Sequence, residues 1–578
     1  MREPLRIRDV SNRIKGPSKE LRPDRAWVPI TARSLATLVG LGSIITGGFL
    51  AHGRYVHNLP LEIPDPITSA TRAATIVTGV LLLLLGRALG RRKKRAFQAA
   101  VVLLGISVVV GHQERLIGIV FLIGLIVYRR EFYALSDPRT GWGALWVFFQ
   151  LVSISLIIGL VLIAFRSELM VGSPSNLDIL RTVVRGLIGL TGPVAFKRDR
   201  TKDLIDFTLG ALGLISVMVP TLLFFRPSSA APRMTVDDEE EMRNLIAKNC
   251  KTDSLAYFAL RREKSVIWSP TRKSCIAYRV ISGVMLASGD PLGDPEAWPL
   301  AIEGFLAEAK RHAWLPAVMG CSELGGEIWV RESGLIALEM GDEAVIEMEE
   351  FTIEGRAMRN VRQMISRIQR NGYQATLRKM SQLSEEERVL VFHASNSWRN
   401  GNVERGFSMA LGRFTDPSDD DCYIVTAQVD GVLKGILHFV PWGDDGISLD
   451  LMRRDRNADP GLNELMIVSA LQQAQVFGIT RISLNFAAFR SIIERGERLG
   501  AGPITRLMRN GLIFVSRWLQ IDSLYRFNAK FRPIWEPRYL VFPRQSDLPK
   551  IGLATLEAEA FFIRPRFMQP SQIKRQLN

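Results

Sequence analysis

The sequence is poor in the residues that bind metals or form disulfide bonds. It contains 4 cysteines and 6 histidines among 578 residues, and no two cysteines stand as C-x-x-C. Structural zinc sites need closely spaced cysteine and histidine ligands, so we predict no metal site. The cysteines lie far apart in the second half of the chain, at 250, 275, 321 and 422. We therefore expect no disulfide framework, and a reducing, cytoplasmic location for that half.

A secretory signal peptide is also missing. The first 25 residues are polar and basic, and the first apolar run starts only near Val28. Long apolar runs follow, which predicts a helical membrane domain over 28–226 behind a basic tail at 1–27. We expect about six membrane helices, at 31–51, 70–90, 96–111, 114–128, 143–165 and 203–225.

Basic residues predict the orientation of these helices. Clusters at 1–27, 91–95 and 128–130 fall on one side of a six-helix arrangement, and the positive-inside rule makes that side cytoplasmic. We expect a multi-pass protein of the cell membrane with a cytoplasmic second half. The weakly apolar segment 176–200 is expected to be re-entrant or interfacial, and a crossing there would change the parity. A membrane anchor and scaffold is favoured over a lipid pathway.

Beyond a Pro/Ser/Ala-rich linker at 227–234, strands and helices alternate. Two blocks share a run of strands, then a helix, then a further strand. The first has strands at 275–280, 284–291 and 315–320 with a helix at 295–313; the second has strands at 422–431, 434–442, 446–454 and 480–487 with a helix at 461–477. This α/β (α+β) layout predicts tandem GNAT-like acyltransferase subdomains at 235–375 and 376–548, followed by a C-terminal tail at 549–578.

The second block lacks the glycine-rich turn that holds a coenzyme A pyrophosphate. Such a turn offers free N–H groups at a helix N-terminus. Here the turn reads RDRNADPG (454–461), with one glycine, a proline without an N–H, and two aspartates that repel phosphate. Coenzyme A is therefore not the expected acyl donor, and we predict no cofactor.

Six stretches together carry a family resemblance. In order, the sequence reads DSLAYFALRREKS (253–265), ASGDPLGDPEAW (287–298), DLMRRD (450–455), NELMI (463–467), SLNFA (483–487) and LYRFNAKFRPIWEPRYLVFP (524–543). The chain resembles the phosphatidylglycerol lysyltransferases, also called the multiple peptide resistance factor family. Its membrane part is shorter than in members that carry a flippase module, so lipid flipping is not expected. No tRNA-synthetase module follows, so the charged tRNA is expected from elsewhere.

This resemblance implies transfer of a lysyl, alanyl or similar group from aminoacyl-tRNA to the glycerol hydroxyl of phosphatidylglycerol or a related anionic lipid. The product would lower the negative charge of the membrane and give resistance to cationic antimicrobial peptides. The expected partners are aminoacyl-tRNA, the lipid and the membrane, with a homo-oligomer left open. Two other functions also stay open: a non-catalytic membrane-anchored scaffold that binds RNA or lipid, and a coenzyme A-dependent N-acyltransferase.

Three residues are the candidate catalytic groups. Asp450 is expected to bind the substrate α-amino group or to accept a proton, and Arg453 to bind a phosphate or the reacting carbonyl. In ideal β geometry these two face opposite sides unless a bend reorients Arg453, and the alternative is a salt-bridged strand end. Lys530 is expected to bind tRNA phosphates or the developing oxyanion.

Five further residues are candidate substrate-binding groups. Asn463 and Glu464 open the predicted helix 461–477, where they either cap it or point into a crevice beyond the strand ends. Asn485 lies on the adjacent strand, is expected to be buried, and must then find partners. Tyr525 and Arg526 belong to one short basic and aromatic stretch with the candidate lysine.

Two further segments contain several arginines, and each has two alternative roles. The predicted helix at 354–373 forms either a solvated face or a patch for tRNA phosphates or anionic lipid. Its arginines are Arg356, Arg359, Arg362, Arg367 and Arg370. The apolar segment 504–520 contains three arginines and forms either a core helix or a membrane-interface segment.

Overall fold

The computed structural model describes residues 25, 27–49, 69–90, 92–101, 115–132, 138–188, 192–224, 234–399, 404, 406–488 and 521–561. They form a helical unit up to residue 224 and an α/β unit from residue 234, and the chain divides between Ser228 and Ser229, within the predicted linker. The segment 504–520 lies outside the described residues.

The helical unit is built of helices that overlap the predicted apolar runs, together with one helix in the segment 176–200. They are α2 (Trp27–Phe49), α3 (Ser69–Leu89), α5 (Arg115–Val127), α6 (Pro138–Ala164), α7 (Asn176–Leu187) and α8 (Asp199–Phe224), and residues 94–101 are also helical. Within the described ranges, two stretches are long and apolar enough to cross a membrane, Gly143–Ala164 and Arg200–Thr221. The six-helix, multi-pass arrangement therefore stays a prediction.

Helix α7 lies in the segment whose path the sequence left open. Its N-terminus is a capping box in which the side chains of Ser175 and Asp178 each accept from the other's backbone N–H. One side of the helix is buried, while Arg181 and Arg185 are exposed. Its 12 residues extend about 18 Å, too short for a hydrocarbon core of about 30 Å. The helix is thus amphipathic, as expected for an interfacial segment, and is too short to be a span.

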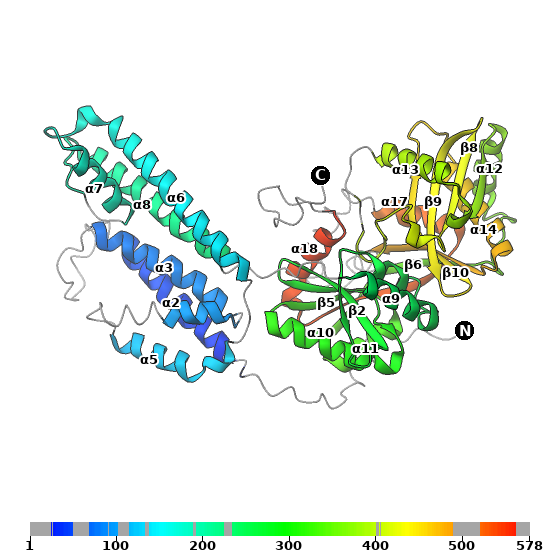
Figure 1. Cartoon of the computed structure of the whole chain (residues 1–578), viewed down its shortest axis with the longest axis horizontal. Helices are drawn as coiled ribbons and strands as arrows, with labels where there is room; N and C mark the ends of the chain where they lie inside the picture. The colour runs from blue at the N-terminus through cyan, green and yellow to red at the C-terminus, as the bar shows by residue number, and fades with distance from the viewer. Residues whose placement is uncertain are drawn as a thin grey trace. The chain divides into compact units, whose positions relative to one another are not determined.

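Glycines allow α2 and α3 to lie against each other (Figure 1). A Cβ atom at Gly79 would lie 2.6 Å from the carbonyl oxygen of Gly40, and one at Gly40 would lie 2.8 Å from the carbonyl oxygen of Gly79. Any side chain at either position would push the helices apart. Small residues at such crossings are how apolar helices pack closely without a hydrophobic driving force between them.

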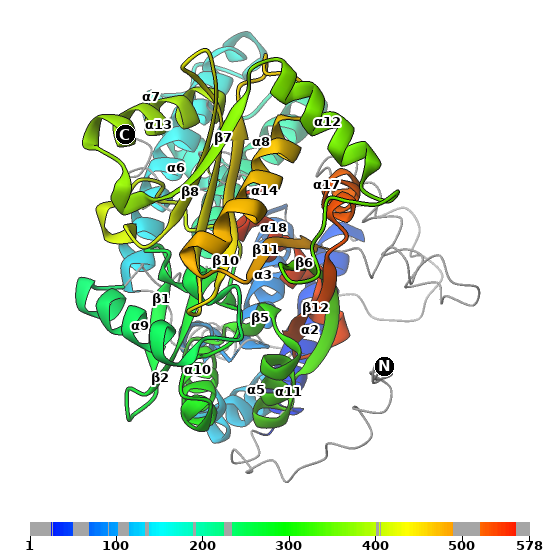
Figure 2. The same cartoon turned by 90° about the vertical axis from the view of Figure 1, so that its right-hand side faces the viewer.

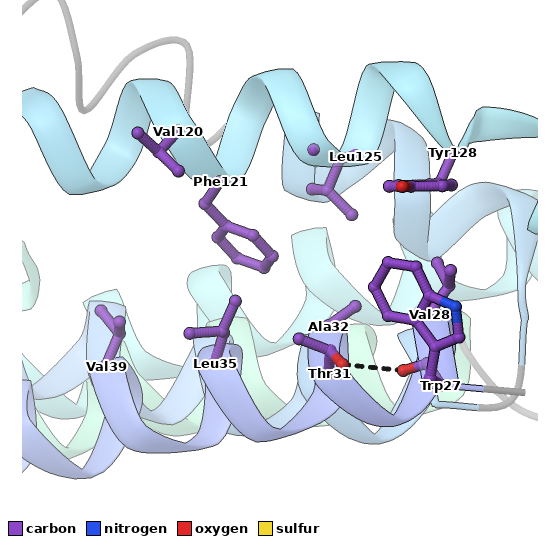
Figure 3. A pocket seen from close by; sticks show the side chains of 11 residues that line it. Trp27, Val28, Thr31, Ala32, Leu35, Val39, Val120, Phe121, Leu125 and Tyr128 are labelled. Carbon is purple, nitrogen blue, oxygen red and sulfur yellow. Dashed lines mark hydrogen bonds between the residues drawn. The ribbon is translucent and has the colours of Figure 1, made fainter.

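An apolar groove of about 440 Å³ runs between α2 and α5 (Figure 3). Leu35, Val39 and Phe121 are among the side chains that line it. At one end the rings of Trp27 and Tyr128 meet edge to face, with centroids 5.1 Å apart. Most side chains that line the groove are apolar, and the Thr31 hydroxyl already donates to the Trp27 carbonyl oxygen at 2.8 Å, so we assign the groove no part in the chemistry.

The α/β unit contains one sheet of 12 strands, in the order β1-β2-β3-β5-β12-β6-β11-β10-β9-β8-β7, with β4 beside β2. The strands are β1 (Ser265–Trp268), β2 (Ser274–Ile281), β3 (Val284–Ser288), β4 (Leu292–Gly293), β5 (Leu315–Cys321), β6 (Ile336–Glu347), β7 (Gln374–Lys379), β8 (Tyr423–Val429), β9 (Val432–Trp442), β10 (Gly446–Arg454), β11 (Arg481–Ala488) and β12 (Ile534–Phe542). Only the pairs β3–β5 and β10–β11 are parallel. Each is joined through a helix, which matches the predicted pair of similar blocks.

Helices cover both faces of this sheet (Figures 1 and 2). They are α9 (Val236–Asn249), α10 (Trp298–His312), α11 (Glu323–Ser333), α12 (Arg359–Arg370), α13 (Glu385–Arg399), α14 (Leu462–Gln473), α17 (Ile521–Asn528) and α18 (Leu548–Ala558). One hydrophobic core, which includes residues of α9, α13 and α18, extends across both halves of the sheet. Separate cores lie under α10 and α11 in the first half and under α12 and α14 in the second.

Strand β12 departs from the predicted subdomain boundary. The sequence assigned 534–542 to the second subdomain, 376–548, but β12 pairs with β5 and β6 of the first half. The predicted tail at 549–578 also begins inside α18, whose Ile551 and Ala554 are fully buried. Local patterns mark a strand or helix but do not reveal its non-local partners, which is why both boundaries differ.

A buried ion network ties β12 to the first half. Arg538 of β12 is 2% exposed; its guanidinium donates to Asp253 at 2.8 Å and to the Ser254 hydroxyl at 2.7 Å, and it also pairs with Glu343 of β6. Each buried charge therefore has partners, which is the condition for its burial to be tolerated.

Asp290 is a further buried carboxyl beside this network. Its oxygens accept from the backbone N–H of Ser322 at 2.9 Å and from the Ser322 hydroxyl at 2.6 Å. Burial, and then repulsion from Asp253, raise the pKa of Asp290 to about 7. At neutral pH this carboxyl therefore holds a proton for part of the time.

Candidate functional site

A β-bulge in β10 sets the direction of Asp450. The register of β10 against β9 shifts between Leu449 and Leu451, so Asp450 is the extra residue. After the bulge, Arg453 reaches Ser395 of α13, and Asp450 contacts His438 on the same face of the sheet. In a regular strand Asp450 and Arg453 would face opposite sides of the sheet. The bulge is the bend that places them on one face.

Both carboxylate oxygens of Asp450 are occupied. Oδ1 accepts from the backbone N–H of Leu411 at 2.7 Å, and Oδ2 lies 2.7 Å from Nδ1 of His438. The side chains of Asp450 and His438 are only 3% and 2% exposed. A carboxylate held in this way orients its neighbours, and a substrate ammonium group would have to displace one of them.

His438 is the residue that sequence reasoning missed. It lies on β9 opposite Leu451, and the edge of the Phe414 ring packs against it at 5.2 Å between centroids. Its Nε2 is buried and has no hydrogen-bond partner in the described part of the chain. A lone polar residue in the apolar run 435–442 was the available signal, because buried polar groups need partners.

Asn485 joins the same cluster from β11. It adopts a left-handed conformation, with φ of 67°, and its Nδ2 donates to the carbonyl oxygens of Met409 at 2.9 Å and Leu449 at 3.0 Å. The predictions that Asn485 lies on the strand next to β10 and finds partners are confirmed. The expectation that it is buried is not, since its position beside the gap between the strands leaves it half-buried. Asp450 and Asn485 therefore hold the same short segment, 409–411, from two neighbouring strands.

The segment 406–412, which we call the anchored loop, is held by charged groups from distant parts of the chain. Glu559 accepts from the backbone N–H of Phe407 at 2.8 Å and of Ser408 at 3.1 Å, and Arg261 donates to the carbonyl oxygen of Ala410 at 3.2 Å. Gly406 and Gly412 at its ends have φ of 110° and 73°, a conformation that glycine adopts without strain. The loop is thus fixed where β10 and β11 stop pairing, just past the Ser448–Ser483 pair. A gap that opens between two parallel strands of an α/β sheet is a common place for a ligand to bind.

Arg453 is partly buried and paired. Its Nη1 donates to the Ser395 hydroxyl at 2.8 Å and its Nη2 pairs with Glu404 at 2.6 Å. The salt-bridged alternative therefore describes its observed contacts, while the phosphate-binding role stays a prediction.

Glu464 and Lys530 form a second cluster on the α14 side of the sheet. Lys530 follows α17 in the turn η8 (Ala529–Phe531), and its Nζ lies 2.7 Å from Oε1 of Glu464. The Glu464 side chain is 7% exposed, whereas that of Lys530 is 39% exposed. The pair is linked to the first cluster through Asn528, whose Nδ2 donates to the Leu484 carbonyl at 3.5 Å. The sequence predicted one pocket; the structure shows two clusters, one around Asp450 and Asn485 and the other, Glu464 with Lys530, on the α14 side of the sheet.

The first turn of α14 is not capped by a side chain. Its N-cap is Gly461, with φ of 105°, so capping does not explain Asn463 or Glu464. Oδ1 of Asn463 is buried without a partner within the described residues. Both observations leave the substrate-binding prediction for Asn463 open.

Tyr525 and Arg526 lie on α17. The Tyr525 ring packs against that of Trp535, with centroids 4.8 Å apart, and Arg526 is exposed. Since α17 ends at Asn528, the continuous helix that would place Arg526 and Lys530 on one face is interrupted by the η8 turn.

One group of potential metal ligands occurs among the described residues, formed by Asp419, Asp421 and Cys422. Asp419 already pairs with Arg243 and Arg413. Burial raises the pKa of the Cys422 thiol well above its usual range, so the metal-binding thiolate is disfavoured. We assign no metal to this group. All four cysteines are buried and unpaired, as expected.

Comparison with known proteins places these clusters in a recognised region. Residues 243–542, just over half of the chain, match the family described as "Phosphatidylglycerol lysyltransferase, C-terminal". The chain is similar to the "Lysylphosphatidylglycerol biosynthesis bifunctional protein LysX" of Rhodococcus jostii (strain RHA1), with 38% identity over 528 residues, 89% of this chain and 47% of the relative. For the protein of the same name from Mycobacterium avium (strain 104), the values are 37%, 559 residues, 93% and 47%. The chain thus spans about half the length of these relatives.

Among solved structures, the α/β unit resembles "The structure of L-PGS from Bacillus licheniformis". The TM-score is 0.50 at 19% identity, and the match covers 58% of this chain and 99% of that chain. At this identity the similarity shows a shared fold, a mixed sheet of the GNAT-like kind, and says nothing of substrate.

Proposed function

Since this chain belongs to the phosphatidylglycerol lysyltransferase family, and is accordingly an aminoacyltransferase that acts in lipid metabolism, we propose that it transfers a lysyl group from an aminoacyl-tRNA to a glycerol hydroxyl of phosphatidylglycerol. The name of its relatives, which refers to lysylphosphatidylglycerol, supports lysine as the donated amino acid and phosphatidylglycerol as the acceptor. We further propose that the helical unit anchors the protein in the cell membrane with the α/β unit in the cytoplasm, as the basic clusters predict.

The reaction exchanges one ester for another. The lipid hydroxyl attacks the ester carbonyl carbon, the bond from that carbon to the tRNA ribose oxygen breaks, and the hydroxyl proton passes to the ribose oxygen. Nothing is oxidised or reduced. The protein must align the attacking lipid hydroxyl with the ester carbonyl carbon, exclude water, and stabilise the oxyanion that forms on the carbonyl oxygen. No cofactor is needed for these steps.

The observation that carries the proposal is that Asp450 and Asn485 fix the anchored loop where β10 and β11 stop pairing, within the family-matching region. We assign Asp450 a positioning role, because its oxygens are already bound by Leu411 and His438. A preorganised loop at this point provides fixed backbone dipoles around the reacting carbonyl.

Lys530 and Glu464 supply the charges that the substrates need. The exposed ammonium of Lys530 suits a tRNA or lipid phosphate, while buried Glu464 suits the substrate α-amino group. In this assignment an incoming ammonium replaces Lys530 at Glu464, and Lys530 turns toward a phosphate. The product would carry an extra amine and reduce the negative charge of the membrane, which supports a role in resistance to cationic antimicrobial peptides.

The test is the lipid product. Cells that express the chain are fed isotopically labelled lysine, and their extracted lipids are examined for lysyl-phosphatidylglycerol. We expect Asp450→Asn and Lys530→Ala to reduce the product at least tenfold at equal amounts of membrane-inserted protein. Asp430→Asn, in the exposed turn between β8 and β9, is the matched control. Absence of any aminoacyl lipid with the unmodified chain would refute the proposed function; full product from both variants would refute the site.

A further inference from the structure

Helix α12 carries a face of arginines that the candidate site does not use. We define the α12 arginine face as Arg356, Arg359, Arg367 and Arg370, all of which are exposed. At 3.6 residues per turn, the three within the helix fall in an arc of about 80°. The sequence from 355 to 373 contains no aspartate or glutamate that would alternate with them.

These four guanidinium groups have no carboxylate partner within 4.0 Å among the residues that the structure describes. Elsewhere in the same unit some exposed arginines are paired, as Arg262 is with Asp416 at 2.6 Å. Arg456 and Arg532 are exposed without a carboxylate partner among the described residues, so it is the clustering of four such arginines that distinguishes α12. Like charges three residues apart on a helix repel each other. The chain therefore keeps an unpaired basic face whose charges make folding less favourable, which points to a negatively charged partner.

The opposite side of α12 holds the face rigidly in place. Val361, Ile365 and Ile368 are buried in the core beneath α12 and α14. Across residues 351–373 no large apolar side chain is exposed. Binding at a membrane interface normally inserts such side chains into the lipid, so a bilayer is the less suitable partner.

The arginine face borders the first turn of α14, where Asn463 and Glu464 lie. A Cβ atom at Gly461 would be 3.3 Å from the carbonyl oxygen of Met364 in α12. Just beyond α12, Asn371 donates to Asp459 at 2.8 Å, in the turn that leads into α14. A polyanion on α12 would therefore extend to the second cluster of the candidate site.

We propose that the α12 arginine face binds the sugar-phosphate backbone of a double-helical RNA. This contact would position the aminoacylated end of the RNA at the candidate site beside β10 and β11. This deepens the proposed function and rests on it for the identity of the donor. Arginine forks form paired hydrogen bonds with phosphate oxygens, and the contacts are independent of base sequence. Double-helical RNA is read mainly through such backbone contacts.

The test measures RNA binding directly, without the transfer reaction. The full chain in nanodiscs of neutral phosphatidylcholine is titrated with a fluorescent RNA hairpin that ends in CCA, at several salt concentrations. The variant is Arg359→Glu/Arg367→Glu/Arg370→Glu. A control with the same charge change, Lys248→Glu/Lys273→Glu/Arg331→Glu, alters exposed residues of the first half.

We expect the variant to bind the RNA at least tenfold more weakly, with a dependence of log Kd on log salt that is less steep by about 2 to 3, while the control binds like the unmodified chain. An equal loss of RNA binding in the variant and the control would show that net charge alone causes the effect, and would overturn the proposal. So would unchanged RNA binding by the variant; if the variant then binds vesicles rich in anionic lipid more weakly than the unmodified chain does, the face belongs to the membrane. The two proposals can be told apart. If the variant loses RNA binding but the unmodified chain makes no aminoacyl lipid in cells, the assignment of α12 to RNA is supported and the proposed function is refuted.

Discussion

At the scale of single residues, the pair His438–Asp450 decides how the anchored loop is held. Replacing His438 with leucine removes the group beside Oδ2 of Asp450 and leaves a buried carboxylate oxygen unpaired. Such a loss costs about 1–3 kcal/mol. We expect His438→Leu to reduce lysyl lipid formation about tenfold or more and to lower the melting temperature.

His438→Asn is the informative partner of that variant, because its side-chain amide can donate to Asp450 from near the position of Nδ1. We expect it to recover most of the lipid product, as measured by lipid mass analysis at matched protein levels. An asparagine variant as inactive as the leucine variant would contradict the hydrogen bond as the reason, and would point to Nε2 instead.

These residues also show what a sequence can reveal about a site. Asp450 and Asn485 stand out as polar residues within apolar strands, so the sequence alone was enough to select them as candidates. Their partners were not. The contact with His438 depends on which strand lies beside β10 and on a bulge that shifts the register, and the contact with Leu411 depends on the path of an irregular loop. Neither leaves a periodic signal in the sequence.

At the scale of elements, the crossing of α2 and α3 depends on Gly40 and Gly79. We expect Gly79→Leu to separate the helices and to reduce the amount of folded protein in the membrane, because its Cβ alone would meet the Gly40 carbonyl at 2.6 Å. Gly42→Leu is the matched control, since a Cβ there has nothing within 4 Å. Fluorescence-detected size-exclusion chromatography of both variants checks this. Equal profiles would mean that the crossing is looser than described.

The element boundaries were the most predictable part of the fold. The alternating stretch 446–454 coincides with β10, and the apolar run 315–320 lies within β5. Periodicity is a local property, so it marks strands and helices well. The position of β12 between β5 and β6 is a non-local property, and no pattern in 534–542 indicates it.

At the scale of the whole molecule, Arg538 joins distant parts of the α/β unit. Arg538→Met would leave Asp253 and Glu343 as buried charges without their partner. We expect a destabilisation of about 3–5 kcal/mol, measured by thermal unfolding of the purified full chain in detergent. Adding Asp253→Asn and Glu343→Gln should restore much of the loss, because the buried charges are then removed together. A single variant as stable as the original would contradict the network as described.

Asp290 predicts how stability depends on pH. Its pKa is about 7 in the folded protein against an ordinary value of 3.8, so the folded state binds more protons between these values. The stabilisation that comes from protonated Asp290 is therefore fully present below about pH 4. It decreases as pH rises toward 7, by at most about 1.4 kcal/mol per pH unit. Asp290→Asn should flatten this part of the unfolding profile and stabilise the protein at pH 8. An unchanged slope would assign the proton to another group.

The late position of β12 in the chain has a consequence for biosynthesis. While the ribosome is still making the residues before 534, β5 and β6 have both been synthesised, yet the strand that separates them does not exist. Their unpaired edges are open to wrong partners during that interval. Nascent chains halted before residue 534 should consequently depend on chaperones, and the first half reaches its native form only after β12, which ends at Phe542, has emerged.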